Sequence, residues 1–392
     1  MRRETRRWVR VLLLMAAVFC CSASLLVWIS APTAALWVFA IVVGEWGHFA
    51  ALAAVILAAV AWRLGPRPAA ALALVAAVNF LSPTLQAMWI ARTLPARCTA
   101  AFSTSTGPPS GRVKPFSLPA LFLGVPLPEV EISELTYGMD GRKPLKLDLY
   151  QPVHPSAPLP LIVMVHGGSW NVGNKEQLSA INRYLAGENY TVAAINYRHA
   201  PKEPFPSAVE DVFRAIDFLK GHAVEAHLDT TRIVLMGRSA GGQIALSAAY
   251  SGKVPEVRGV VALYAPADLV LGYEKPSRRW VLDSKKVLED YLGGTRTEKP
   301  QTYAAASPIN FVGAGTPSTL LIHGSLDPIV WPLQSENLAA RLQEAGRPHL
   351  YLPLPWATHG CDANLSGPSG QLTLYAIDRL LAAAFAPASA EP

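Results

Sequence analysis

The chain has 392 residues, which allows two domains or one large domain with appendages. Hydrophobic residues make up 51% and charged residues only 16%, a balance that is unusually apolar for a wholly soluble enzyme. The net charge of +6 arises at the front, because residues 1–97 contain nine arginines and two acidic residues. A nucleic-acid-binding domain needs basic residues clustered on a folded unit, so we expect no nucleic-acid partner.

The apolar pattern of residues 1–96 predicts a membrane segment with about three transmembrane helices. Apolar runs cover residues 8–29, much of 35–62 and about 69–90, and each is long enough to cross a bilayer. Most arginines of this segment lie before the first run or between the second and third. The positive-inside rule then places everything after the third run on the non-cytoplasmic side. A cleaved signal peptide is the alternative for the first run, although two more apolar runs follow it.

Two polar residues, Glu45 and His48, interrupt the second apolar run. Such groups inside a membrane are often functional. A position in a loop or at the membrane interface is the simpler interpretation, and it is the one we expect.

Four cysteines occur without any metal-binding spacing, so we predict no metal site. Cys20 and Cys21 lie in an apolar run and are expected to be packing residues. Cys98 and Cys361 could form a disulfide if the later part of the chain lies in an oxidising compartment.

Residues 97–129 are rich in Pro, Gly and Ser, a composition typical of a linker. Within them, residues 116–125 are apolar but too short to span a bilayer. This stretch either lies on the membrane surface or packs on the domain that follows.

Residues 130–392 predict a single α/β domain. Eight strand-length apolar runs alternate with helical patterns, which indicates a mostly parallel sheet with flanking helices. The strands are expected at 135–138, 145–150, 159–165, 191–196, 232–236, 259–264, 318–323 and 350–354. The helices are expected at 176–185, 208–220, 243–250, 332–345 and 371–385. Residues 269–304 break the alternation and are interpreted as a lid or wall over a site at the carboxyl ends of the strands.

The motif Gly237-Arg-Ser-Ala-Gly241 lies between a predicted strand and a predicted helix. This is the pattern of a nucleophile elbow, in which a serine stands on a sharp turn. Small residues two positions before and after Ser239 let the strand and the helix approach closely. Ser239 is therefore the candidate nucleophile.

A serine nucleophile needs a histidine base that is oriented by a carboxylate. The chain order expected for this arrangement is Ser, Asp, His, which Ser239, Asp327 and His359 satisfy. Asp327 and His359 each follow a predicted strand. His323 ends a strand and is expected to fix a loop, and Asp362 is the alternative acid.

The catalytic intermediate also needs hydrogen-bond donors for its oxyanion. The segment Val165-His-Gly-Gly-Ser-Trp follows a buried strand and contains two adjacent glycines. We predict the amides of Gly167, Gly168 and Ala240 as donors, with His166 anchoring the loop.

These motifs together resemble α/β-hydrolase esterases of the hormone-sensitive-lipase-like and related carboxylesterase group. The resemblance covers residues 130–385, and the matching stretches are His166-Gly-Gly-Ser-Trp, Asn196-Tyr-Arg-His-Ala-Pro, Gly237-Arg-Ser-Ala-Gly-Gly, His323-Gly-Ser-Leu-Asp and His359-Gly. It implies the same roles for Ser239, Asp327 and His359. Ser169 replaces the usual third glycine and Arg238 the usual acidic residue, which favours the broader bacterial carboxylesterase branch.

The predicted protein is therefore a membrane-anchored serine carboxylesterase for short- to medium-chain acyl esters, acting through an acyl-enzyme without a cofactor. A serine peptidase or amidase of the same fold is one alternative. A non-catalytic hydrolase-like binding protein is another.

Overall fold

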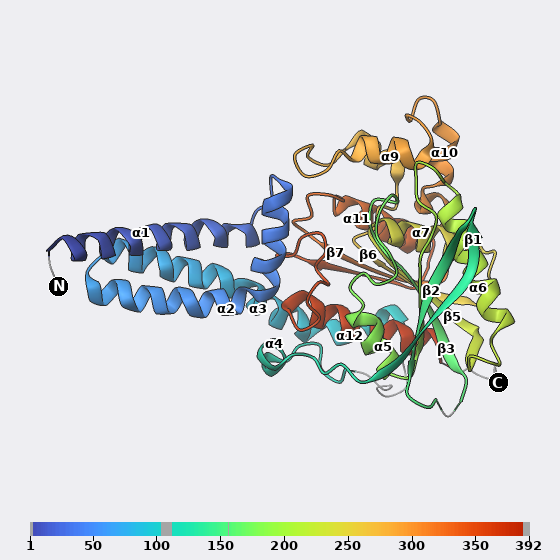
Figure 1. Cartoon of the computed structure of the whole chain (residues 1–392), viewed down its shortest axis with the longest axis horizontal. Helices are drawn as coiled ribbons and strands as arrows, with labels where there is room; N and C mark the ends of the chain where they lie inside the picture. Colours follow the sequence, from blue (N-terminus) through green and yellow to red (C-terminus); the bar gives the residue numbers. More distant parts are fainter. Residues whose placement is uncertain (1–2, 103–111, 156, 387–392) are drawn as a thin grey trace.

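The computed structural model describes residues 3–102, 112–155 and 157–386, in which a helical bundle projects from one end of an α/β domain (Figure 1). The bundle consists of α1 (Arg3–Ser24), α2 (Ala34–Leu64) and α3 (Arg67–Phe102), with a 3-10 turn at Leu25–Val27. Each of the three helices is long and apolar enough to cross a membrane. They pack through alanines, as helices in membranes commonly do, and these include Ala17, Ala58, Ala61, Ala69, Ala70 and Ala73. The prediction of three long apolar helices is confirmed.

Helix α3 is longer than the apolar run that predicted it. It continues through Pro83 and Pro95 to Phe102, six residues past the boundary expected at residue 96. Its last turns are buried in the core of the α/β domain through Leu94, Cys98 and Phe102. This packing keeps the chain helical although each proline removes a backbone hydrogen bond. Residues 103–111 of the predicted linker lie outside the described residues.

The apolar stretch at 116–125 forms the short helix α4 (Leu118–Leu123). Its Leu121 carbonyl oxygen lies 3.1 Å from His48 Nε2 of α2. On the domain side, Ser117 N donates to Gln371 Oε1 at 2.8 Å. The stretch therefore packs on both the domain and the bundle, and Leu123 stays exposed.

Glu45 and His48 lie inside α2 and are buried, which corrects the expectation of a loop or an interface with the membrane surface. Glu45 Oε2 accepts a hydrogen bond from Ser369 N at 3.1 Å. Both residues therefore attach α2 to other parts of the protein, because a buried polar group needs a hydrogen-bond partner.

The domain contains one eight-stranded sheet in the order β1-β2-β4-β3-β5-β6-β7-β8. β1 pairs antiparallel with β2, β2 antiparallel with β4, and all other neighbours are parallel, so the mostly parallel sheet is confirmed. The strands are β1 (Val130–Asp140), β2 (Lys143–Pro152), β3 (Leu159–Val165), β4 (Thr191–Ile195), β5 (Leu228–Arg238), β6 (Val257–Leu263), β7 (Ser318–Gly324) and β8 (His349–Leu354). The central strands are almost entirely buried, as their continuous apolar runs predicted.

Helices cover both faces of this sheet, and each face has its own hydrophobic core (Figure 1). The helices are α5 (Ala180–Gly187), α6 (Ser207–Gly221), α7 (Ala240–Tyr250), α8 (Leu269–Glu274), α9 (Ser284–Leu292), α10 (Pro300–Ala305), α11 (Leu333–Glu344) and α12 (Pro368–Ala384). The cluster that contains α12 also contains residues of α2 and α3. The bundle and the domain thus share one hydrophobic core.

The register of the parallel strands brings their carboxyl ends to one edge. Val165 of β3 pairs with Gly237 of β5, and Gly237 pairs with Ala262 of β6. His323 of β7 pairs with Pro353 of β8. The loops that follow these strands carry all the predicted site residues, so the sheet itself gathers them.

All four cysteines are free thiols. Cys98 and Cys361 are both buried and form no disulfide. The structure therefore contains no disulfide between Cys98 of α3 and Cys361 of the domain.

Candidate active site

Ser239 stands on a strained turn between β5 and α7. Its backbone has φ 52° and ψ −123°, a conformation that residues with side chains rarely adopt. A Cβ on Gly237 would lie 2.2 Å from the Gly241 carbonyl oxygen, and one on Gly241 would lie 2.2 Å from the His166 carbonyl oxygen. Only glycine fits at either position, so the steric requirement of the predicted elbow is met.

The structure brings Ser239, His359 and Asp327 into one line of hydrogen bonds. Ser239 Oγ lies 2.9 Å from His359 Nε2. His359 Nδ1 lies 2.6 Å from Asp327 Oδ2, to which it donates. Because the Nδ1 proton of His359 is held on the ring and donated to the carboxylate, Nε2 is free to accept the proton of the serine hydroxyl.

Asp327 is completely buried but remains a carboxylate. Burial alone would raise its pKa, but the adjacent His359 and His323 rings outweigh burial and lower the pKa to about 2. Its second oxygen accepts from the amides of Ile329 and Val330 at 2.8 and 2.9 Å. The acid is therefore charged and fixed in position at neutral pH.

His323 lies next to Asp327 but is not part of the hydrogen-bonded set of Ser239, His359 and Asp327. Its Nδ1 is 2.7 Å from Ser335 Oγ, and its Nε2 is 2.9 Å from the Val330 carbonyl oxygen. Its ring also approaches Asp327 Oδ2 at 3.2 Å. These contacts agree with the expectation that His323 fixes the loop after β7.

Asp362, the alternative acid, is engaged elsewhere. It forms a buried ion pair with Arg238, and Tyr264 Oη donates to its Oδ1 at 2.5 Å. Burial acts to lower the pKa of Arg238, but the Asp362 carboxylate outweighs it and raises that pKa above its ordinary value. Arg238 is thus a charged structural residue beneath the elbow.

Two residues near His359 escaped the sequence analysis. The Tyr264 ring packs on the imidazole at 4.5 Å between ring centroids. Tyr264 directly follows β6, and that position was the available signal. Trp37 of α2 donates from Nε1 to the His359 carbonyl oxygen at 2.9 Å, and its position in an apolar helix gave no signal.

The predicted oxyanion donors are not all free. Gly167 N donates to Gln177 Oε1 at 2.7 Å, so this amide is engaged within the protein. Within the described residues, the amides of Gly168 and Ser169 donate no hydrogen bond. Ala240 begins α7, so its amide has no partner in the helix. Free amides therefore remain at Gly168 and Ala240, with Ser169 as an additional one.

His166 anchors this loop from below. Its Nδ1 donates to the Gly167 carbonyl oxygen at 2.7 Å, and its ring stacks on Tyr197 at 4.3 Å between centroids. Burial lowers the pKa of His166 to about 4, so the ring is neutral at neutral pH.

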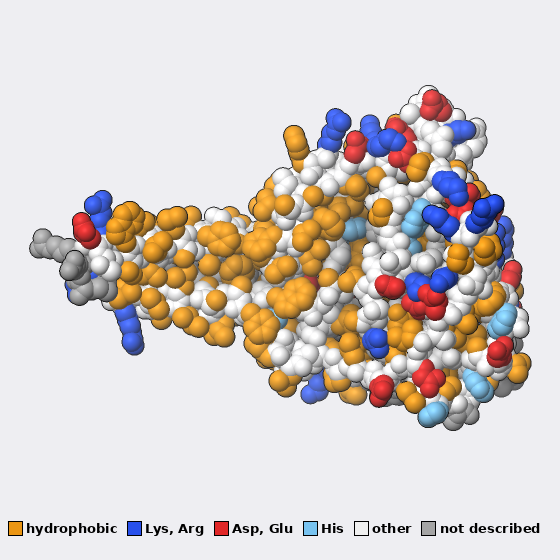
Figure 2. Space-filling model, in the orientation of Figure 1, with side chains coloured by type: hydrophobic (Ala, Val, Ile, Leu, Met, Phe, Trp, Pro, Cys, Tyr) orange, Lys and Arg blue, Asp and Glu red, His pale blue; other side chains and the backbone are white. Residues whose placement is uncertain are grey.

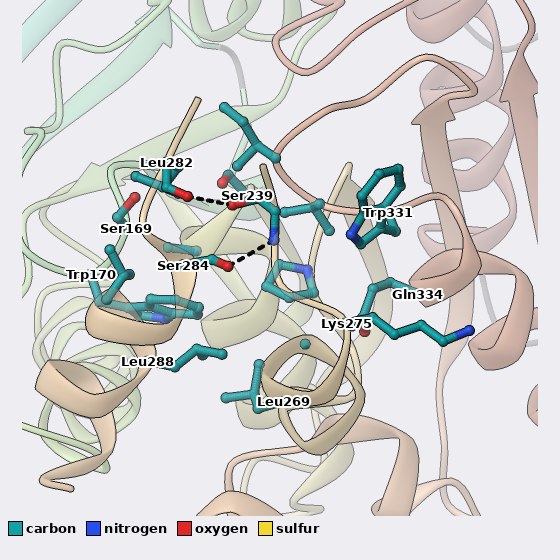
Figure 3. Close-up of a pocket in the computed structure, with 17 residues that line it drawn as sticks. Ser169, Trp170, Ser239, Leu269, Lys275, Leu282, Ser284, Leu288, Trp331 and Gln334 are labelled. Carbon is teal, nitrogen blue, oxygen red and sulfur yellow. Dashed lines mark hydrogen bonds between the residues drawn. The ribbon is translucent and has the colours of Figure 1, made fainter. Parts of the chain in front are cut away.

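Two cavities meet at Ser239. The first, called the apolar lobe, has a volume of about 50 Å³ and is shown in Figure 3. Trp170, Leu269, Leu288 and Trp331 contribute to its walls. The predicted insertion at 269–304, which forms α8 to α10, does provide one wall of this lobe. A stack of Trp170 on Tyr291, 4.4 Å between centroids, ties α9 to the loop after β3.

The second cavity, called the His359 lobe, is larger, with a volume of about 260 Å³. The loop glycines Gly167 and Gly168 line it together with His359. Trp37 of α2, next to His359, and Leu282 also line it. A helix of the bundle is thus part of the wall of this cavity.

Among the described residues, no group of three or more His, Cys, Asp or Glu side chains is placed to hold a metal ion. The polar groups at Ser239 consist of a base, an acid and backbone amides. This set suits nucleophilic attack on a carbonyl carbon.

Comparison with known proteins assigns this chain to a family. The sequence model of the family described as BD-FAE matches residues 147–342, which is half of the chain. The chain belongs to the BD-FAE family. The BD-FAE match includes Ser239 and Asp327 and ends before His359.

Individual relatives of this chain are named as ester hydrolases. The probable carboxylic ester hydrolase LipM of Mycobacterium tuberculosis is 28% identical over 64% of this chain and 61% of its own length. Esterase LipC of the same organism is 30% identical over 57% of this chain and 58% of its own length. The chain thus spans about three fifths of the length of these curated relatives.

The crystal structure of esterase LipW from Mycobacterium marinum has a TM-score of 0.54 at 22% identity, covering 77% of this chain and 91% of that one. A likeness at this identity concerns the fold. The α/β-hydrolase fold predicted from the sequence is therefore confirmed for this BD-FAE member.

Proposed function

We propose that this protein is a serine carboxylesterase. The observation that carries the proposal is the line from Ser239 through His359 to Asp327, next to backbone amides without partners. The names of the matched relatives, a carboxylic ester hydrolase and an esterase, support the same reaction class.

In the proposed mechanism, Ser239 Oγ attacks the ester carbonyl carbon while its proton passes to His359 Nε2. Asp327 stabilises the imidazolium that forms. The tetrahedral intermediate collapses as His359 returns the proton to the alcohol oxygen, which releases the alcohol and leaves an acyl-enzyme. Water then attacks the acyl-enzyme with the same proton transfers, releasing the acid and restoring Ser239.

The oxyanion of the intermediate is assigned to the amides of Gly168, Ser169 and Ala240. Gly167 is replaced by Ser169 in this set because Gln177 already accepts from the Gly167 amide. Each such donor contributes about 10²–10³-fold to the rate in comparable sites.

The apolar lobe suits a short acyl group. Its volume of about 50 Å³ is one third of the ~150 Å³ apolar cavity that holds a benzene ring. That space fits two or three heavy atoms beyond the carbonyl. We therefore expect acetyl to butyryl esters to be preferred within the short- to medium-chain range.

The layout of the chain is part of the proposal. Residues 1–96 anchor the protein in a lipid bilayer, and residues 130–392 form the catalytic domain. Residues 97–129 link these two parts. The arginines near the N-terminus and at Arg63 and Arg67 support a non-cytoplasmic catalytic domain. Single cysteines introduced at exposed domain positions, in a variant lacking the native ones, would react with an impermeant thiol reagent in intact cells. Protection until lysis would reverse the orientation.

The decisive experiment compares the full chain with its Ser239→Ala variant on p-nitrophenyl acetate, butyrate and octanoate. We expect hydrolysis by the wild type that falls with acyl length, and a loss of about 10⁴-fold or more in the variant. Equal rates for both proteins would refute the proposal. Faster cleavage of peptide amides than of acyl esters would indicate the peptidase or amidase alternative instead.

A further inference from the structure

The His359 lobe differs from the apolar lobe in what surrounds it. All the residues that line the apolar lobe belong to the α/β domain, whereas Trp37 of α2 is among those that line the His359 lobe. Trp37 both lines the cavity and donates to the His359 carbonyl oxygen. The membrane segment therefore takes part in the shape of the site.

The leaving group of the proposed reaction belongs in this lobe. His359 Nε2 must reach the alcohol oxygen to protonate it, so the alcohol lies on the side of Ser239 that His359 occupies. The lobe is about five times larger than the apolar lobe. The alcohol is thus the bulky part of the ester, and it lies against α2.

Exposed apolar side chains lie near this lobe, next to the charged Arg278 and Arg279. Leu282 lines the lobe, and two residues before it Trp280 is 84% exposed. The Trp280 carbonyl oxygen accepts from Ala34 N at 3.1 Å, which docks this segment on the start of α2. Trp28 and Ile29, just before α2, are each 52% exposed. We call Trp28, Ile29 and Trp280 the tryptophan rim.

The rim continues the apolar surface of the bundle. Figure 2 shows hydrophobic side chains running from the bundle onto the near end of the domain, with few charged ones between them. Exposed tryptophans at such a border are typical of the membrane–water interface. Side chains this apolar would otherwise be left in water, at a cost that burial in lipid removes.

We propose that the substrate is a short-acyl ester of a lipid alcohol, which enters the His359 lobe from the bilayer surface past the tryptophan rim. This inference rests on the proposed esterase activity and adds the class of the alcohol. The acyl group occupies the apolar lobe, while the tail of the alcohol stays in the bilayer beside α2.

The test uses the full chain in phosphatidylcholine vesicles and two esters that share one acyl group. One is butyrylglycerol, which is soluble in water. The other is butyrylglycerol with a hexadecyl ether chain, which resides in the vesicles. We expect the lipid ester to be hydrolysed about tenfold faster or more at equal total ester, at a rate set by its mole fraction in the bilayer.

Two variants test whether the tryptophan rim itself favours the lipid ester, or whether the ester is hydrolysed faster only because the vesicles concentrate it. Trp280→Ser is expected to lower the ratio of lipid to soluble rates by about tenfold. Trp62→Ser is the matched control, since Trp62 is 67% exposed on the bundle but far from the lobe, and it should leave that ratio unchanged.

The outcomes distinguish the two proposals. A ratio at or below one, or equal effects of the two variants, would overturn the lipid-alcohol proposal while Ser239-dependent release from butyrylglycerol upholds the esterase. Release that does not depend on Ser239 would overturn the esterase and, with it, the lipid substrate.

Discussion

The loop after β7, residues 325–332, and the loop after β8, residues 355–367, each deliver one partner to Ser239, but they are held in different ways. Asp327 binds the amides of its own loop at Ile329 and Val330. The loop that carries His359 is held instead by Arg238 of β5 through Asp362, and by Trp37 and Glu45 of α2. The acid is thus positioned by residues close in sequence, and the base by residues more than a hundred positions away.

The sharpest test of this contrast replaces the acid itself. In Asp327→Asn, the amide donates to His359 Nδ1, which moves the ring proton to Nε2 and leaves no acceptor for Ser239. We expect kcat to fall by about 10⁴-fold, as in other Ser-His-Asp triads, with the fold intact. Rates with p-nitrophenyl butyrate and a circular dichroism spectrum would measure this. A loss below about tenfold would remove Asp327 from the triad.

Replacing Asp362 should reduce the stability of the fold more than it reduces the catalytic rate. Asp362→Asn leaves the buried Arg238 without its counter-charge, which we expect to cost about 3–5 kcal/mol of unfolding free energy. Thermal unfolding of the full chain in detergent would show the loss. Arg238→Met combined with Asp362→Leu should recover much of it, because an apolar pair leaves no buried charge. A normal unfolding midpoint for Asp362→Asn would contradict this role.

A substitution at Trp37 in the bundle would disturb the loop after β8, which carries His359. Trp37→Phe keeps a ring in the His359 lobe but removes the donor to the His359 carbonyl oxygen. We expect kcat for butyrylglycerol to fall by about two- to tenfold, the value of one hydrogen bond, with little change in KM.

The control for Trp37 is Trp62→Phe, which should behave as wild type. A fluorophosphonate titration separates positioning from misfolding, since positioning slows labelling of Ser239 without lowering the labelled fraction. A reduced labelled fraction at an unchanged rate constant would show that Trp37 only stabilises the fold.

Glu45 is expected to have the smallest effect. Glu45→Gln keeps an oxygen acceptor for Ser369 N at the N-terminus of α12 and replaces the other carboxyl oxygen by an amide group. The loss should be at most about 1 kcal/mol of stability, the value of one hydrogen bond, with a rate within about twofold of wild type. Unfolding midpoints measured beside Asp362→Asn would check the order. A loss as large as that of Asp362→Asn would instead make Glu45 a main support of the loop after β8.

The same contrast explains what the sequence could predict. Residues 159–165 and the elbow at Ser239 were predictable because local hydrophobicity and glycine sterics define them. Asp327 and His359 followed from their order and their places after strands.

Other features depend on contacts that a single sequence does not reveal. The contact of Trp37 with His359 joins residues 322 positions apart, and nothing in an apolar helix marks one tryptophan as special. The engagement of the Gly167 amide depends on where Gln177 points. Residues 97–102 looked like the start of a linker, yet they are helical, with Cys98 and Phe102 buried against the domain.

Helix α3 has a consequence for how the protein is made. Its 36 residues extend for about 54 Å at 1.5 Å per residue, and its end lies in the core of the α/β domain. The ribosome delivers α3 before any strand of the sheet. The α/β domain therefore completes one of its hydrophobic cores on a helix that is already synthesised, and cutting the chain at residue 97 would remove part of the surface that covers α12. Folding of the α/β domain is thus coupled to α3, against which α12 and β8 pack.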